Sequence, residues 1–504
     1  MDTLKKFVGL QVGEDSSLQP PTEGILKETQ NKYDKAEQGH VFQLYQSLSP
    51  AEKATLYKQA SEIDPEHINS VVQQTKQENK DNKDELSPLP EQVCASLIDC
   101  EAEDKEKWYK LGLDLASQGK VAVIVMAGGQ GTRLGSSAPK GCFDIGLPSH
   151  KSLFQLQAER INKVGKLAQK RASAETLVAV PWYIMTSGPT RQSTEEFFTQ
   201  HDHFGLSNVD VKFFDQGTLP CIDNDGKIIL ESPSKIAVAP DGNGGIYNAL
   251  ITGGVLEDME RRGIEHVQVY CVDNCLAKVA DPTFFGWAAS RKLDIATKVV
   301  RKRNPQESVG LVMLRNGKPD VVEYSEIDKA TTEEKEASGL LRYRTANIVQ
   351  HYYSYKFLAE APRWASTLPH HVAKKKIPYY DLEAKEVVKP DSPNGIKMEQ
   401  FVFDVFPLIP LEKFGCLEVA REDEFSPLKN ATGEDSAETS RKDLLQQGAK
   451  WVTAAGGYSV DDGAAGGNDG VEISPLISYG GEGLEGHVKG QEIRGLGYIE
   501  ARTT

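Results

Sequence analysis

Residues 121–141, VAVIVMAGGQGTRLGSSAPKG, join a wholly apolar run to a loop rich in glycine and basic residues. The run Val121–Met126 predicts a strand that is buried on both faces, as in a parallel sheet covered by helices. Because Gly128, Gly129 and Gly131 lack side chains, the backbone N–H groups of the loop can approach an anion closely. The stretch therefore predicts a buried strand that leads into a phosphate-binding loop.

The two cations of this loop suit a polyphosphate. Arg133 offers a planar fork for phosphate oxygens, and Lys140, which follows Pro139, offers a point charge. A dinucleotide-binding fingerprint would need glycine in place of Leu134, and a P-loop would need Gly-Lys-Ser/Thr, so neither motif fits. The alternative is a glycine-rich turn with two incidental surface cations. The combination of residue types favours a nucleoside triphosphate site.

The full string resembles the signature GGxGTRLGxxxPKG of the nucleotide-sugar pyrophosphorylases, which it matches without a gap. The resemblance implies that a nucleoside triphosphate and a sugar 1-phosphate react to give a nucleotide-sugar and pyrophosphate. It also implies that Gly128, Gly129 and Gly131 bind the nucleotide, and that Arg133 and Lys140 neutralise the leaving pyrophosphate.

Composition restricts the class of protein. The chain has 504 residues, a formal net charge of −15 and seven cysteines. A nucleic-acid binder would show a clustered basic surface, and no apolar stretch approaches the roughly 18 residues of a membrane span. The N-terminus has no signal-peptide pattern, and an odd number of cysteines without Cys-x-x-Cys indicates reduced thiols. We therefore expect a cytoplasmic monomer that binds neither nucleic acid nor membrane.

From Val121 onward, short apolar runs alternate with amphipathic segments, which predicts a parallel sheet covered by helices on both faces. The expected strands are 121–126, 180–186, 211–214, 267–273 and 295–300, and the expected helices are 152–165, 193–201 and 245–261. The second helix should begin at the box Ser193-Thr-Glu-Glu196. The fold class is α/β, with a doubly wound, mostly parallel, Rossmann-like sheet; the resemblance implies the nucleotidyltransferase fold.

Three parts are expected along the chain: a helical region 1–110, a catalytic domain 111–406 and a small β-rich domain 407–504. Residues 35–75 look helical, because Ser49-Pro-Ala-Glu52 is a capping box with proline in the first turn. Residues 454–490 are rich in glycine and acids and include the strand-like piece 471–478.

A second glycine-rich loop, PDGNGG at 240–245, precedes an expected helix. Close backbone approach to a ligand and a plain helix-entry turn both explain such a loop. It resembles a loop of the eukaryotic uridylyl-transferring branch of the family, in which Gly242 would contact the base and Asn243 would reach the sugar. In the same resemblance Gln216 would read the uracil edge, since an amide can pair with both a carbonyl and an N–H.

Asp273 ends the expected strand 267–273. Ligands of open α/β sheets bind at the carboxyl ends of the strands, so the loop after Met126, Gln216 and Asp273 should line one crevice. A carboxylate there can hold Mg²⁺ against phosphates, whereas the alternative is an Asx turn. A glycosyltransferase of similar fold would carry Asp-x-Asp at this point, and the nearby Asp223-Asn-Asp-Gly226 predicts a hairpin turn instead.

Further motifs resemble the UDP-N-acetylglucosamine pyrophosphorylase subfamily: Val309-Gly310, 322–326, 346–348, 394–406 and 421–431. The resemblance implies that the sugar is held by Gly310, Glu323 and Asn347. It implies an acetamido pocket walled by Tyr324, Phe401 and Phe403, and it implies that Lys429 reaches the phosphate of the sugar. From its chemistry alone, Glu323 would need hydrogen-bond donors if buried, which sugar hydroxyls can supply. Each motif could also be a solvated strand edge.

The expected reaction joins UTP to N-acetylglucosamine 1-phosphate and gives UDP-N-acetylglucosamine and pyrophosphate, with Mg²⁺ as the cofactor. The phosphate oxygen of the sugar is already a nucleophile at neutral pH, so catalysis needs positioning and charge stabilisation rather than a general base. Two alternatives stay open. A uridylyltransferase for glucose or galactose 1-phosphate would not need the apolar wall, and a non-catalytic UDP-sugar sensor would be expected to lose Arg133, Lys140 or Asp273.

Overall fold

The computed structural model describes residues 19–77, 84–460 and 470–500. By its contacts the chain divides into two compact units. Unit 1 comprises residues 1–82, 217–245 and 369–401, and unit 2 comprises residues 83–216, 246–368 and 402–504. Unit 1 is thus assembled from three separate segments of the chain. The three-part division at residues 110 and 406 partitions the chain differently and stays a prediction.

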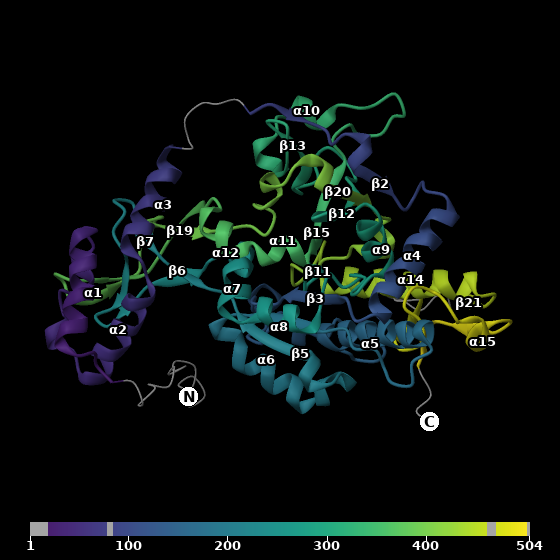
Figure 1. Ribbon diagram of the computed structural model, residues 1–504, viewed down its shortest axis with the longest axis horizontal. Coiled ribbons are helices and arrows are strands. Elements are labelled where there is room, and N and C mark those ends of the chain that lie inside the picture. The colour runs from purple at the N-terminus through teal and green to yellow at the C-terminus, as the bar shows by residue number, and fades with distance from the viewer. Residues whose placement is uncertain (1–18, 78–83, 461–469, 501–504) are drawn as a thin grey trace, which may run out of the picture. The chain divides into compact units, whose positions relative to one another are not determined.

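An 11-stranded sheet forms the centre of unit 2, and its strands follow one another in the order β2-β20-β12-β15-β11-β3-β4-β5 (Figure 1). Their bounds are β2 Cys94–Ser96, β20 Phe414–Glu418, β12 Ile295–Arg301, β15 Thr345–Ser354, β11 His266–Cys271, β3 Val121–Met126, β4 Trp182–Thr186 and β5 Val211–Asp215. A hairpin of β13 (Leu311–Arg315) and β14 (Lys318–Val322) joins β15, and the eleventh strand, β1 (Leu86–Ser87), pairs with β13. Only β15 runs antiparallel to its neighbours on the path, so the predicted α/β class with a large, mostly parallel sheet is confirmed.

The five expected strands correspond to β3, β4, β5, β11 and β12. The strands β15 and β20 were not predicted from the sequence. In β15 the polar side chains of Gln350 and His351 are fully buried, which interrupts the apolar pattern that marks a central strand. In β20, a side chain at position 415 would meet the ring of Trp287, so this position is a glycine. A glycine inside a strand interrupts the pattern of β-branched and aromatic residues that marks a strand in sequence.

The three expected helices correspond to α5 (Leu153–Ala172), α6 (Gly188–Gln200) and the pair α7 (Ile246–Thr252) and α8 (Val255–Arg262). The predicted start of α6 at Ser193 is wrong, because the capping box is formed by Ser187, with proline in the first turn. The third helix is divided at Gly254, whose φ of +62° is left-handed. Within the described ranges, no helix has the length and apolar character of a membrane span.

Helices cover both faces of the sheet in unit 2. Trp182 and Ile184 of β4 share a core with Phe154 of α5, whereas Tyr183 between them donates a hydrogen bond of 2.8 Å to Asp258 of α8. Figure 1 shows α7 and α8 on one side of the strands, with α4 (Ala102–Ser117) and α9 (Pro282–Ser290) on the other. Since alternate side chains both meet helices, the sheet is doubly wound.

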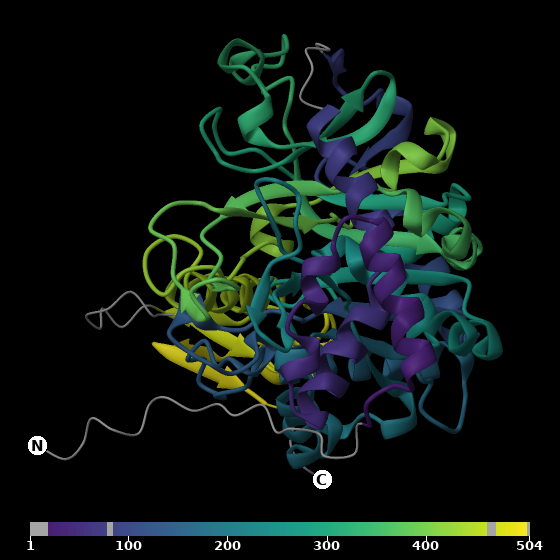
Figure 2. The same ribbon diagram turned by 90° about the vertical axis from the view of Figure 1, so that its left-hand side faces the viewer.

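The described part of unit 1 includes the α-helices α1 (Glu23–Lys35), α2 (Pro50–Glu62) and α3 (Pro65–Gln77), drawn in purple and blue in Figure 2. The predicted capping box at α2 is confirmed, since Ser49 N donates to Glu52 Oε2 at 2.8 Å. The hairpin turn predicted at 223–226 is also confirmed. Asp223 Oδ1 accepts from Asp225 N at 2.9 Å, so this acid closes a turn.

Candidate active site

The loop that follows β3 is held in shape by its own backbone. Gly131 N donates to Ala138 O at 3.0 Å, and Lys140 N donates to Gly129 O at 3.1 Å. Gly135 has a φ of +76°, which a residue with a side chain would adopt only under strain. Arg133 lies in the exposed 3₁₀ turn between these contacts. The loop therefore presents the guanidinium from a preorganised backbone.

Gln216 lies directly on the glycine loop. A Cβ at Gly128 would be 2.2 Å from Gln216 Oε1, so only glycine permits this contact. Gln216 N donates to Thr186 O at 2.9 Å at the end of β4, and Ser187 Oγ donates to Gly128 O at 2.7 Å. The structure thus brings the loop after β3 together with Gln216 at one end of the sheet, as predicted from sequence.

Asp273 follows β11 and meets the cation of the glycine loop. Lys140 Nζ donates to Asp273 Oδ2 at 3.1 Å, and the two side chains are 20% and 24% exposed. Asp273 and the glycine loop therefore lie next to each other at this end of the sheet, and the crevice that they would line stays a prediction. The ion pair also fixes Lys140 at the end of the central strand pair β3 and β11, which is parallel and in register up to Met126 and Cys271.

Lys429 reaches the same region through a pairing that sequence did not predict. Leu428 N donates to Asp273 O at 2.8 Å, and Asn274 forms an antiparallel bridge with Pro427. Burial raises the pKa of the Cys271 thiol, whereas the charges of Lys140 and Lys429 both act to lower it. Both ammonium groups therefore lie around the end of β11. Lys429 is half exposed, with Asp435 Oδ2 at 3.6 Å from its Nζ.

Asn274 holds the segment that carries Lys429, a role that was not predicted from the sequence. It is 2% exposed; its Oδ1 accepts from Ser426 N at 3.0 Å and its Nδ2 donates to Glu424 O at 2.8 Å. The signal available in the sequence was a strand-end amide, which can donate and accept at once. Asn274 ties the segment that carries Lys429 to the residue beside Asp273.

A buried triad of charged residues holds Glu424, which lies in the segment that Asn274 binds. Lys298 of β12 is fully buried and pairs with Asp281 at 2.6 Å and with Glu424. Although burial opposes it, the two carboxylates raise the pKa of Lys298, and the charge of Lys298 lowers the pKa of Asp281, so this lysine and this aspartate stay charged. Breaking such a buried pair leaves an uncompensated charge, which is strongly destabilising. The triad therefore fixes the side chain of Glu424, whose backbone carbonyl accepts the hydrogen bond from Asn274.

The three residues predicted to hold the sugar lie together in unit 2. Asn347 N donates to Gly310 O at 2.9 Å, and a Cβ at Gly310 would be 3.1 Å from Glu323 Oε1. The pairing of β12 with β15 shifts register beside Asn347, and Val349 there has a left-handed φ of +51°. Asn347 Oδ1 accepts from Val349 N at 3.0 Å. Such bulges redirect a side chain, here that of Asn347.

The three residues predicted to wall the acetamido pocket are distributed over both units. Tyr324 is 50% exposed and Phe403 is 7% exposed, both in unit 2. Phe401 belongs to unit 1, where its ring stacks on His371 with centroids 4.4 Å apart. The wall as a single surface therefore stays a prediction.

The loop PDGNGG belongs to unit 1 and is tied to the segment before Phe401. Gly242 has a φ of +85°, and a Cβ there would be 2.3 Å from Gln400 O. Gly244 N donates to Gln400 O, and Gln400 N donates to Asp241 O, both at 2.8 Å. Asp241 is 7% exposed, and burial raises its pKa to about 6. Asn243 follows in the 3₁₀ turn Asn243–Gly245, and its contact with a sugar stays a prediction.

The residues around Asp273 fit a metal that arrives with its nucleotide. Among the residues that the structure describes, no group of three or more His, Cys, Asp and Glu side chains is placed to hold a metal ion. Asp273 supplies one carboxylate, and only its Oδ2 is paired with Lys140. Mg²⁺ usually takes one or two protein carboxylates together with phosphate oxygens and water, so a single carboxylate beside a phosphate loop is sufficient.

Comparison with known proteins agrees with this geometry. A family model described as UTP–glucose-1-phosphate uridylyltransferase matches residues 65–453. A relative from Saccharomyces cerevisiae named UDP-N-acetylglucosamine pyrophosphorylase is 46% identical, over 91% of this chain and 96% of its own length. A human relative named UDP-N-acetylhexosamine pyrophosphorylase-like protein 1 is 43% identical, over 92% of this chain and 95% of its own.

Solved structures give the same result. The uridine diphosphate N-acetylglucosamine pyrophosphorylase of Trypanosoma brucei, in complex with an inhibitor, superposes with a TM-score of 0.80 at 32% identity, covering 92% of this chain and 94% of that one. A UDP-glucose pyrophosphorylase from Leishmania major shares the fold, with a TM-score of 0.55 at 19% identity. With the loop, the strand-end acid and the matching family model in agreement, the chain belongs to the UTP–glucose-1-phosphate uridylyltransferase family of enzymes.

Proposed function

We propose that this enzyme transfers the uridylyl group of UTP to N-acetyl-α-D-glucosamine 1-phosphate, forming UDP-N-acetylglucosamine and pyrophosphate. The observation that carries the proposal is the meeting of Lys140, Asp273 and Lys429 around the end of β11. The name of the relatives at 46% and 45% identity supports the choice of substrate.

The reaction needs no base from the protein. An oxygen of the sugar phosphate attacks the α-phosphorus of UTP, and the bond from that phosphorus to the oxygen bridging to the β-phosphorus breaks in line with it. Lys429 binds the incoming phosphate, and Arg133 with Lys140 binds the leaving pyrophosphate. Backbone hydrogen bonds hold the segments that carry these cations. The cations can therefore stabilise the charge that develops in the transition state without a rearrangement of the protein.

Binding of the two substrates divides over the remaining residues. Gln216, with Gly128 beneath it, reads the uracil edge, and Gly242 approaches the base. Asn243, Gly310, Glu323 and Asn347 bind the sugar, while Tyr324, Phe401 and Phe403 contact its acetamido group. Aromatic faces suit a methyl group and an amide plane, since both gain from leaving water.

Asp273 would hold Mg²⁺ together with phosphate oxygens of UTP. When bound, the ion neutralises phosphate charge as a Lewis acid. The ion pair of Asp273 with Lys140 holds both charged groups at the strand end before substrates bind. We further propose a cytoplasmic monomer, in which residues 1–110 form a helical appendage and residues 407–504 a small terminal domain.

A pyrophosphate-release assay with UTP and a panel of sugar 1-phosphates tests the function. N-acetylglucosamine 1-phosphate should give the highest kcat/KM, above glucose and galactose 1-phosphates. A preference for glucose or galactose 1-phosphate would favour the hexose uridylyltransferase instead. Binding of UDP-sugar with no release of pyrophosphate from any substrate would favour a non-catalytic sensor.

A further inference from the structure

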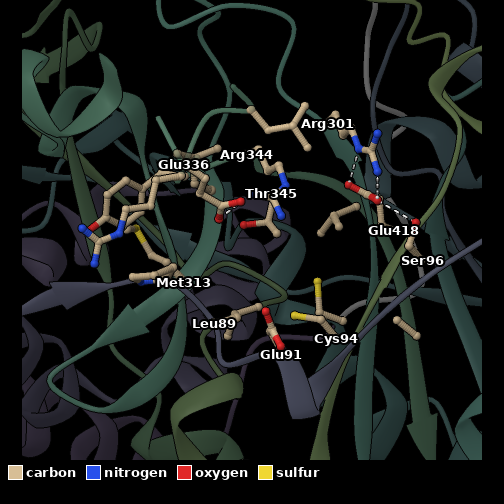
Figure 3. Close-up of a pocket in the computed structure, with 18 of the residues that line it drawn as sticks. Leu89, Glu91, Cys94, Ser96, Arg301, Met313, Glu336, Arg344, Thr345 and Glu418 are labelled. Atoms are coloured by element: carbon tan, nitrogen blue, oxygen red, sulfur yellow. Dashed lines mark hydrogen bonds and ion pairs between the residues drawn. The ribbon is translucent and has the colours of Figure 1, made fainter. Parts of the chain in front are cut away.

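A cavity of about 380 Å³ lies in unit 2 beside the end of the sheet that begins with β2 (Figure 3). Its walls come from residues 88–99, from the segment 336–344 that precedes β15, and from β12, β13, β15 and β20. Apolar side chains such as Leu89 and Met313 line it together with the thiols of Cys94 and Cys416. None of the residues that we place in catalysis or substrate binding is among its lining residues.

The two thiols stand directly opposite each other. Cys94 of β2 and Cys416 of β20 are register partners in a parallel pairing, so their side chains point to the same face. Neighbouring strands lie about 4.8 Å apart, and disulfides join Cα atoms about 4.4–6.8 Å apart. The spacing expected for their Cα atoms therefore falls within the range that a disulfide spans.

The two thiols differ in access and in reactivity. Cys94 is half-buried at the cavity, whereas Cys416 is 1% exposed. A hydrogen bond from the Cys416 thiol lowers the pKa of Cys94 against the effect of burial, and the charges of Arg291 and Arg344 act in the same direction. By contrast, burial raises the pKa of Cys142 to about 12. A partly exposed thiol beside cations is the usual setting of a reactive cysteine.

The charged part of the cavity suits a small peptide-like thiol. Arg344 pairs with Glu336 at 2.8 Å, and Arg301 pairs with Glu418 at 2.8 Å, so the walls carry charges of both signs. A low-molecular-weight disulfide built from a peptide carries both carboxylates and ammonium groups. The carboxylates of such a molecule can pair with the arginines, and its ammonium groups can pair with the glutamates. Opening the existing ion pairs costs little, because each pair is partly exposed and contributes little to stability.

We propose that Cys94 and Cys416 form a redox-active dithiol that reduces a small peptide disulfide, of the glutathione type, entering this cavity. The Cys94 thiolate attacks one sulfur of that disulfide, forming a mixed disulfide and releasing one small thiol. Cys416 then attacks the sulfur of Cys94 and releases the second small thiol, and the protons of the two cysteines pass to the two leaving thiols. Two protein thiols are oxidised to one disulfide while the small disulfide is reduced to two thiols. This chemistry is independent of the proposed transferase activity.

The test uses the full chain, reduced and then exposed to glutathione disulfide, with intact mass and peptide mapping as readouts. The wild type should gain a link between Cys94 and Cys416 and retain no adduct. Cys416→Ser should instead hold one tripeptide adduct on Cys94, since nothing resolves it. Cys94→Ser should leave Cys416 unmodified. Cys100→Ser, which changes a half-buried cysteine outside the cavity lining, is the matched control and should behave as the wild type.

A second measurement needs no variant. In the reduced wild type at neutral pH, alkylation of Cys94 by iodoacetamide should be about tenfold faster than alkylation of Cys100, since thiolate and not thiol reacts. Equal rates at the two cysteines would overturn the proposal. So would an adduct or disulfide at Cys416 in the Cys94→Ser variant, because the first attack would then not belong to Cys94.

Discussion

Arg133 is exposed on a loop whose backbone is fixed by its own hydrogen bonds, so its replacement should leave the fold intact. Arg133→Ala should lower kcat by about 100–1000-fold, because loss of one preorganised donor to the transition state typically costs about 2.7–4 kcal/mol. Pyrophosphate release measures the effect, and thermal unfolding checks the fold. Near-normal turnover would separate Arg133 from the leaving group.

Asp273 is partly exposed, and its Oδ2 pairs with Lys140. Asp273→Asn should reduce Mg²⁺-supported turnover by about 100-fold or more, because a bound metal ion contributes several kcal/mol of charge stabilisation. A Mg²⁺ titration of initial rates measures this loss. Asp225→Asn, which alters an exposed acid of the hairpin turn in unit 1, is the control. An unchanged Mg²⁺ dependence in Asp273→Asn would mean that phosphates or another acid hold the ion.

At the scale of the element, the pairing of Asn274 with residues 424–428 decides where Lys429 stands. Asn274→Ala removes one donor and one acceptor from a buried backbone segment, which should lower the stability by about 1–3 kcal/mol. Because Lys429 is proposed to bind the sugar phosphate, KM for N-acetylglucosamine 1-phosphate should rise more than KM for UTP.

Initial-rate kinetics with each substrate varied in turn separates these outcomes. The matched control is Asn430→Ala, since Asn430 is exposed and bonds only Glu434 O by its side chain within the described ranges. If the variant loses stability as expected but KM rises equally for both substrates, Asn274 supports the fold without positioning Lys429.

The loop around Asp241 gives a prediction about pH. Burial raises the pKa of this carboxyl from 3.8 to about 6, so the folded state binds its proton more tightly than the unfolded state. Its contribution to stability is therefore full below about pH 4 and is lost as the pH rises through about 6.

Asp241→Asn is neutral at every pH and lacks this loss. The stability of the variant relative to the wild type should therefore grow by about 3 kcal/mol between about pH 4 and about pH 7. Thermal unfolding of both chains across this range measures the difference. A difference that does not change with pH would show that Asp241 titrates normally in the folded state.

Strands and loops that carry their own local signal were predictable from sequence. The run Val121–Met126 and the glycine loop behind it form as expected. The start of α6 was misplaced because the sequence offers two serine boxes, and only the tertiary structure selects Ser187 over Ser193. β15 was missed because its fully buried Gln350 and His351 interrupt the apolar pattern, and the partner of Gln350 across the sheet, Gln268 of β11, is 82 residues away in sequence. Asn274 was missed because Glu424 and Ser426, the residues that it ties to the strand end, are 150 and 152 residues away in sequence.

For the molecule as a whole, the rule for open α/β sheets placed the loop after β3, Gln216 and Asp273 at one edge of the sheet, but nothing in the sequence predicted that the segment of Lys429 joins them. The meeting of Lys140, Asp273 and the segment of Lys429 depends on β11 standing beside β3. The adjacency of β11 and β3 is a matter of strand order in the sheet, and no short sequence pattern in this chain specifies that order. The helix α4 spans residue 110 and belongs to unit 2, whereas the predicted division at that residue stays untested.

The boundary predicted at residue 406 can be tested by truncation. A chain that ends there lacks β20, which pairs with both β2 and β12 in the central sheet. Cys416 and Leu417 of β20 are buried. Removal of β20 would therefore expose apolar surface and leave β12 with an unpaired edge. Residues 1–406 should therefore aggregate or unfold without a cooperative transition, as measured by size-exclusion chromatography and calorimetry.

The matched control begins at residue 19 and keeps every described element, so it should unfold as cooperatively as the full chain. A soluble 1–406 chain with a cooperative transition would instead support an independent domain beyond residue 406. In that case β20 would be an addition to a sheet that is already stable, and Lys429 would be supplied by a separate domain. The pairing of Asn274 with Pro427 argues for the first outcome, since it joins the segment after β20 to the strand end that carries Asp273.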